Sequence, residues 1–121
     1  MKDRENTIVV KSKAFGCRMM RLRAYLVSEK HEFEISKQVL RSGTSIGANV
    51  KEAIRGQSKA DFGAKMNIAL KEASETEYWL EMLYEGSFID KKGFDSVVKD
   101  CHELIRILTA IVKTTFKDKE L

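Results

Sequence analysis

Residues 39–57 read VLRSGTSIGANVKEAIRGQ, and this stretch decides the fold. Its apolar residues recur at three- and four-residue steps, which predicts a helix. Gly43 and Gly47 stand four residues apart and therefore share one face of that helix. A glycine inside a helix costs about 1 kcal/mol relative to alanine, and close packing of a second helix against it is the usual compensation. The stretch predicts an assembly of closely packed helices.

The composition suits one domain of long helices. The chain has 121 residues and no proline, and 43% of its residues are hydrophobic. This length allows one core, and helices without proline can run uninterrupted. No apolar run approaches the roughly 20 residues that a membrane span needs, and the basic amino terminus lacks the apolar core of a secretory signal. We expect a cytoplasmic protein with no membrane partner, in which Cys17 and Cys101 are reduced and buried.

Apolar periodicity predicts amphipathic helices over residues of about 6–27, 32–55, 59–85 and 91–116. Gly56 is expected to cap the second helix, and Ser58 with Asp61 resembles a capping box at the start of the third. The connections are short, so sequential helices should lie antiparallel. The sequence therefore predicts an all-α fold, an antiparallel up-down-up-down four-helix bundle, with residues 1–121 forming a single domain.

The sequence holds more apolar residues than one bundle core needs. Further apolar stripes run beside the core stripes of the first, second and third helices. A large exposed apolar patch is unusual on a monomer, so we expect a homo-oligomer. The alternative is a monomer with a wide core. The candidate interface residues are Gly43, Gly47, Val50, Ile54, Ile68, Glu72, Glu75, Trp79 and Met82.

Patterns of catalytic and metal-binding residues are missing from the sequence. The two histidines, His31 and His102, belong to no Glu-x-x-His pair of the kind that di-iron bundles use. We expect His31 in the loop between the first two helices and His102 at the edge of the bundle. Neither GxGxxG nor GxxxxGK[ST] occurs. The sequence predicts a protein that is not an enzyme and has no metal and no cofactor.

Charge is segregated along a chain whose net charge is +4. Residues 1–30 contain eight basic and three acidic side chains, whereas residues 58–86 contain three and six. In one interpretation, helices of opposite charge pair between subunits, with Glu72 and Glu75 as partners; we prefer this role for them to acid–base catalysis. In the other, an oligomer repeats the basic stripes and binds phosphate. The candidate nucleic-acid-binding residues are Lys11, Arg18, Arg21, Lys37, Arg41, Lys51 and Arg55.

Two blocks of the sequence, with Asp61-Phe62 between them, resemble a known family. They are LRSGTSIGANVKEA at residues 40–53 and IALKEASETEYWL at residues 68–80. The chain resembles the bacterial four-helix-bundle proteins encoded in intervening sequences of 23S rRNA genes, sometimes labelled S23 ribosomal proteins. The resemblance implies an up-down bundle that assembles into a ring-shaped homopentamer, and it brings no catalytic residues. A more distant resemblance, to the accessory variability protein of diversity-generating retroelements, implies a basic pentameric barrel that binds nucleic acid and a reverse transcriptase.

Two functional classes follow. The first is a non-catalytic oligomer associated with RNA through the basic stripes of the first two helices. The second is a scaffold oligomer that binds a protein partner and whose charges serve subunit assembly. Salt-dependent binding to structured RNA separates them, because each neutralised phosphate makes affinity fall with salt.

Overall fold

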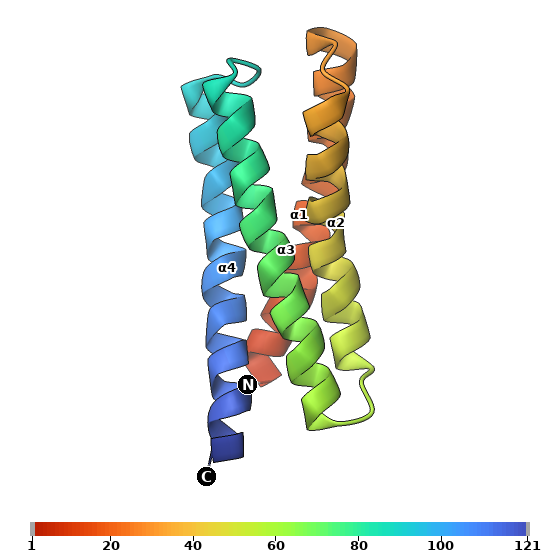
Figure 1. The fold of residues 1–121 in the computed structure, drawn as a ribbon, viewed down its shortest axis with the longest axis vertical. Coiled ribbons are helices and arrows are strands. Elements are labelled where there is room, and N and C mark those ends of the chain that lie inside the picture. Colours follow the sequence, from red (N-terminus) through yellow and green to blue (C-terminus); the bar gives the residue numbers. More distant parts are fainter. Residues whose placement is uncertain (1, 121) are drawn as a thin grey trace.

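The computed structural model describes residues 2–120, with the side chains of residues 3–117. Within this range the chain forms four helices and no strands: α1 (Lys2–Lys30), α2 (Glu34–Ile54), α3 (Lys59–Glu85) and α4 (Lys91–Glu120). The helices alternate in direction, and each packs beside the next in the chain (Figure 1). The predicted all-α four-helix bundle is confirmed. α1 is longer at both ends than the sequence indicated, and α2 begins two residues later.

A buried carboxylate sets the start of α2. His31 adopts a left-handed backbone conformation with a φ of 54°. The carboxylate of Glu32 then accepts hydrogen bonds from the backbone N–H groups of Glu34, Ile35 and Ser36, at 3.2, 3.0 and 2.6 Å. These N–H groups have no carbonyl partner within the helix, so the side chain of Glu32 acts as their cap. Glu32 therefore precedes α2 instead of opening it.

The link between α2 and α3 follows a different pattern from the expected glycine cap. The C-terminal cap residue of α2 is Arg55, and Gly56 donates its N–H to the carbonyl oxygen of Ala53 at 3.0 Å. Among residues 2–120 no glycine has a positive φ, so the expected capping role of Gly56 is corrected. The predicted cap of α3 is present: the hydroxyl of Ser58 accepts a hydrogen bond from the N–H of Asp61 at 3.0 Å.

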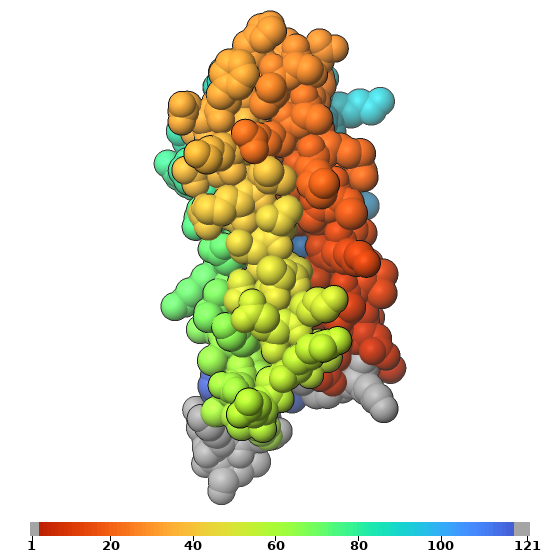
Figure 2. Space-filling model, turned by 90° about the vertical axis from the view of Figure 1, so that its right-hand side faces the viewer, coloured from red at the N-terminus to blue at the C-terminus, as the bar shows by residue number. Residues whose placement is uncertain are grey.

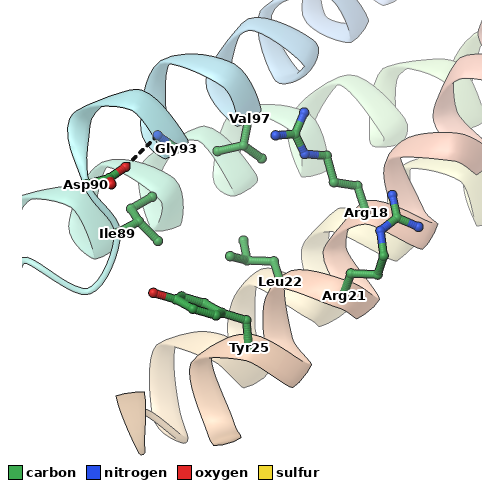
Figure 3. A pocket seen from close by; sticks show the side chains of 8 residues that line it. All are labelled: Arg18, Arg21, Leu22, Tyr25, Ile89, Asp90, Gly93 and Val97. Carbon is green, nitrogen blue, oxygen red and sulfur yellow. Dashed lines mark hydrogen bonds between the residues drawn. The ribbon is translucent and has the colours of Figure 1, made fainter. Parts of the chain in front are cut away.

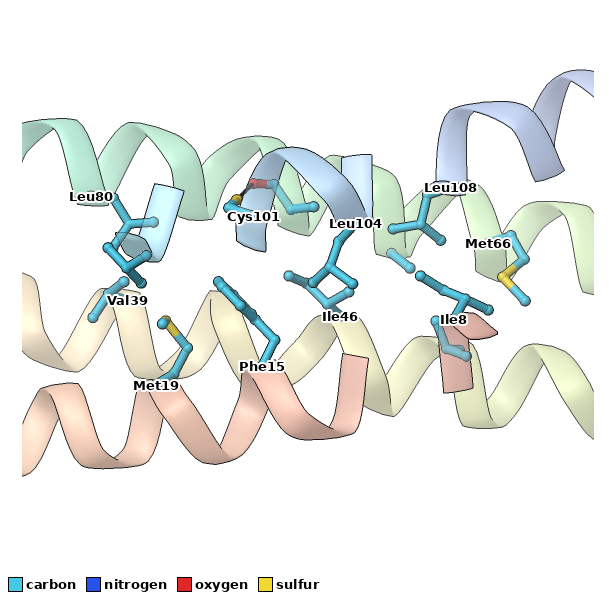
Figure 4. Close-up of a cluster of buried hydrophobic side chains, with 14 of the residues drawn as sticks. Ile8, Phe15, Met19, Val39, Ile46, Met66, Leu80, Cys101, Leu104 and Leu108 are labelled. Carbon is cyan, nitrogen blue, oxygen red and sulfur yellow. Dashed lines mark hydrogen bonds between the residues drawn. The ribbon is translucent and has the colours of Figure 1, made fainter. Parts of the chain in front are cut away.

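The core runs the length of the bundle between the inner faces of the helices (Figure 4). It includes Phe15 and Met19 from α1 and Leu104 from α4, all buried. Cys101 is also buried, and its thiol donates to the carbonyl oxygen of Ala73 at 3.3 Å. Burial raises the pKa of this thiol to about 12. Cys17, expected to be buried, is exposed.

The two glycines of α2 face α1 of the same chain. A Cβ added to Gly43 would lie 2.3 Å from Cγ of Met19, and one added to Gly47 would lie 3.4 Å from the carbonyl oxygen of Ser12. The close helix contact predicted from the glycines is therefore present, but inside the bundle. Gly43 is buried within the chain and does not line a surface groove, so its assignment to an interface between subunits is corrected.

Candidate functional site

Two grooves flank α1, one on each side. We call the hollow between the outer faces of α1 and α2 the α1–α2 groove; its volume is about 550 Å³. The space-filling view looks onto the face where α1 (red to orange) and α2 (orange to yellow) lie side by side (Figure 2). The residues that line this groove are Val9, Ser12, Lys13, Gly16, Cys17, Met20, Thr44, Gly47, Ala48, Val50, Lys51, Ile54 and Arg55.

The α1–α2 groove is apolar and carries charge of only one sign. It is open at its centre because Gly16 and Gly47 bring no side chains to it. Large apolar side chains border it, among them Met20, whose exposed fraction is 60%. The charged residues of its lining, as far as the described residues go, are the cations Lys13, Lys51 and Arg55. The groove therefore suits an apolar ligand surface that carries negative charge.

The second groove lies between α1 and α4, and we call it the α1–α4 groove. It consists of two hollows of about 350 and 380 Å³ that share Arg18 and Arg21. It exists because α4 packs less extensively against α1 than against α3. Figure 3 shows the first hollow, with Leu22 and Tyr25 of α1 facing Val97 of α4.

Two of the predicted phosphate-binding cations pair with α4 of the same chain. The ammonium of Lys11 lies 2.9 Å from a carboxylate oxygen of Glu103. Nη1 of Arg18 lies 2.6 Å from Oδ2 of Asp100, and its Nη2 donates to the hydroxyl of Ser96 at 2.8 Å. These cations face carboxylates, so they contribute less to the attraction of a phosphate than the sequence suggested.

A third cation, Arg41, pairs with α3. Its guanidinium lies 3.3 Å from Oε2 of Glu72 and also forms an ion pair with Glu75. Glu75 in turn accepts a hydrogen bond from the indole N–H of Trp79 at 2.9 Å. The two carboxylates were predicted to pair between subunits; within one chain, both pair with Arg41. Part of the charge segregation in the sequence therefore serves the packing of helices within the bundle.

The remaining predicted cations do not form one site. Within residues 2–120, no ion pair is found for Arg21, Lys37, Lys51 or Arg55. Arg21 lies in the α1–α4 groove, whereas Lys51 and Arg55 line the α1–α2 groove, and Lys37 is exposed near the start of α2. One cation of the α1–α2 groove was not predicted from the sequence. Lys13 lines this groove together with Lys51 and Arg55. A helical wheel of the first helix places Lys13 within about 40° of both Val9 and Met20 and could have found it.

The predicted interface residues that reach the surface form two separate sets. Ile54 borders the α1–α2 groove. The other set lies on α3, where Ile68 and Met82 are exposed and the other members are half-buried. We call this second set the α3 stripe; it consists of Ile68, Glu72, Glu75, Trp79 and Met82.

Groupings typical of catalysis or metal binding do not stand out among the described residues. In residues 2–120, no three side chains of the His, Cys, Asp and Glu types are grouped so that they could hold a metal ion. The exposed His102 lies with its Nε2 2.5 Å from Oε2 of Glu77, at the edge of the bundle. His31 lies in the loop between α1 and α2. None of the helices, over the residues described, has the length and apolar character to cross a membrane.

The fold defines the class of protein, an antiparallel four-helix bundle, here with grooves between α1 and α2 and between α1 and α4. Within that class, the chain belongs to the 23S rRNA-intervening sequence protein family, whose model matches residues 4–110. It is similar to a solved structure from Bacteroides thetaiotaomicron, described as a protein of unknown function from the S23 ribosomal protein family. The sequences are 49% identical, the TM-score is 0.90, and the match covers 91% of this chain and 98% of the other. The predicted family is confirmed. No curated protein matches the chain, and neither matching description names a catalytic activity.

Proposed function

We propose that this protein is a non-catalytic cytoplasmic bundle that assembles with copies of itself. In this assembly the α3 stripe of one copy lies in the α1–α2 groove of the next. The observation that supports the proposal is complementarity: the groove is apolar with cations only, and the stripe is apolar with two carboxylates that share one cation, Arg41.

The geometry of such a contact is compatible with a closed ring. The groove and the stripe are different surfaces of one chain, so each copy offers a groove to one neighbour and a stripe to the other. Contacts of this head-to-tail kind close into rings when the rotation between subunits allows it. A ring of five is the number that the family resemblance implies.

The test places a charge in the groove. Met20→Glu replaces an apolar side chain that the assembly would bury with a carboxylate, which would also face Glu72 and Glu75 of the neighbouring copy; like charges brought together in an interface cost several kcal/mol. The matched control is Val10→Glu on the same helix, at a residue that is 68% exposed and outside the groove. We expect light scattering to give the mass of a monomer for Met20→Glu and an oligomer for Val10→Glu. Equal masses for the two variants would contradict the proposal.

A second candidate function, binding of structured RNA, is favoured by a specific observation. Lys37, Lys51 and Arg55 are exposed along α2, and none has an ion pair within residues 2–120. Unpaired cations on one helix can each contact a phosphate, and the contacts multiply if the chain oligomerises.

The test of RNA binding is a matched pair of triple variants. Lys37→Gln, Lys51→Gln and Arg55→Gln together should weaken binding at least about tenfold and reduce the slope of log K against log salt by about 3. The control changes Lys92, Lys99 and Lys113 on α4 to Gln, which removes equal charge from exposed positions elsewhere. Equal losses of RNA affinity in both variants would mean that net charge alone, and not the face of α2, determines binding. Loss of the oligomer in the first variant would instead assign Lys51 and Arg55 to assembly.

A further inference from the structure

The hollow between α1 and the start of α4 is not used by the proposed assembly, because its residues lie on the opposite flank of α1 from the α1–α2 groove. Its volume is about 350 Å³, near the lower end of the range of small-molecule pockets. This space is of the right order for one nucleotide and far too small for a duplex. We therefore consider which single group its walls would hold.

One wall presents an aromatic ring. Tyr25 is 43% exposed, so a ligand can reach its ring. Its side chain lies beside Leu22, and opposite them Ile89 and Val97 complete an apolar surface (Figure 3). A ring at the edge of a small apolar hollow can hold a flat, partly apolar group by stacking.

The polar groups of the hollow include both donors and an acceptor. Arg21 is four residues before Tyr25 and shares its helix face, and no ion pair to it is found within residues 2–120. Arg18 is held by Asp100 and Ser96.

The acceptor of the hollow is Asp90, which caps α4 by accepting the N–H of Gly93 through Oδ1 at 2.7 Å. Over the described residues, no hydrogen bond to its second oxygen, Oδ2, is found.

The charge balance argues against a site for phosphate alone. Arg18 and Arg21 stand with Asp90 in this hollow, and with Lys11, Asp100 and Glu103 in the next. The carboxylates offset part of the positive charge, so a polyanion gains less from this lining than it would from cations alone. A nucleobase, by contrast, has a flat face for stacking and both donors and acceptors on its edge.

We propose that this hollow binds one unpaired base of RNA, stacked on Tyr25, with the adjoining phosphate on Arg21. The inference deepens the RNA-binding candidate function and rests on it. A base inside a duplex is stacked and paired and cannot enter, so the site selects single-stranded loops or ends.

The experiment compares two probes with the same phosphates. A fluorescein-labelled RNA of ten nucleotides and an abasic oligomer of equal length are titrated with the full chain, and binding is followed by fluorescence anisotropy. We expect the wild type to bind the RNA at least about fivefold more tightly than the abasic oligomer, because stacking distinguishes them. Tyr25→Ala should abolish this preference, and Tyr25→Phe, which keeps the ring, should retain it.

Two further variants serve as controls. Tyr78→Ala removes a tyrosine of α3 that is 51% exposed, and it should leave the preference unchanged. Arg21→Gln should weaken both probes alike, since it removes a phosphate contact. Thermal melting followed by circular dichroism checks that each variant is folded.

The outcomes separate the two levels of the proposal. If the wild type binds both probes equally, or if folded Tyr25→Ala keeps the preference, the base-binding site is refuted while RNA association stands. If the wild type binds neither probe, the base-binding site and RNA association by this chain both fail.

Discussion

The same substitution at the two glycines of α2 should have different effects on stability. In Gly43→Ala, the new Cβ would lie 2.3 Å from Cγ and 3.2 Å from Cβ of Met19. Cγ is the second carbon of a fully buried side chain, and rotation about the outer bonds of Met19 does not move it away. In Gly47→Ala, the nearest atom would be the carbonyl oxygen of Ser12 at 3.4 Å, an ordinary contact.

The magnitudes follow from two terms. Replacing glycine by alanine inside a helix stabilises it by about 1 kcal/mol. At Gly43 this gain is opposed by overpacking, which costs about 1 to 3 kcal/mol. We therefore expect Gly47→Ala to be about 1 kcal/mol more stable than the wild type, and Gly43→Ala to be less stable than Gly47→Ala by about 1 to 3 kcal/mol.

Urea denaturation at a fixed protein concentration measures both effects, since any self-association makes stability depend on concentration. A double-mutant cycle tests the cause. Met19→Ala removes the clashing Cγ and keeps Cβ at 3.2 Å, so Gly43→Ala should be less destabilising when it is added to that variant. All variants of the cycle should carry Gly47→Ala as a common background, because its added stability offsets part of the cost of the cavity that Met19→Ala leaves. A Gly43→Ala variant as stable as Gly47→Ala would refute the argument from close approach.

The remaining predictions concern the caps and the cysteines. Glu32→Ala and Ser58→Ala should each lower the unfolding free energy by about 1 kcal/mol in denaturation, because each leaves helix N–H groups without an acceptor. Iodoacetamide should label Cys17 and spare Cys101 in the folded protein, as mass spectrometry of the digest would show; equal labelling would contradict the burial of Cys101. The folded state raises the pKa of Cys101 from 9.0 to about 12, so folding retains a proton that the unfolded chain loses above pH 9. The unfolding free energy should therefore decrease between pH 9 and 12, and less steeply in Cys101→Ala than in the wild type.

The fold could be predicted from the sequence because the apolar periodicity and the helix-capping residues agree. Apolar residues recur at helical steps, and Ser58 caps the start of α3 as expected. The start of α2 could not be predicted in the same way. The carboxylate of Glu32 folds back onto three N–H groups that follow it, and a glutamate near a helix start is more often an ordinary first-turn residue.

The site was harder to predict because charge patterns do not reveal partners. Arg41 belongs to a stripe that a wheel shows as solvated, and Lys11 lies beside the core stripe of its helix; each reaches a carboxylate on a neighbouring helix. The side chains of lysine and arginine are long enough to cross a helix seam, so the register between helices decides their partners. Likewise the second apolar stripe of α2 indicated a contact, and only the packing shows that Gly43 meets Met19 of its own chain.

The two proposals meet at α1, whose opposite flanks border the two grooves. Met20 lies on the flank that faces α2, and Tyr25 lies on the flank that faces α4. A neighbouring subunit seated over Met20 would therefore leave the ring of Tyr25 open. In a ring of identical subunits the base-binding hollow would recur once per chain, and weak contacts to single bases would add up along one strand of RNA. Assembly would then serve RNA binding by repetition, even though the ion pairs within each chain remove several of its cations from direct contact with phosphate.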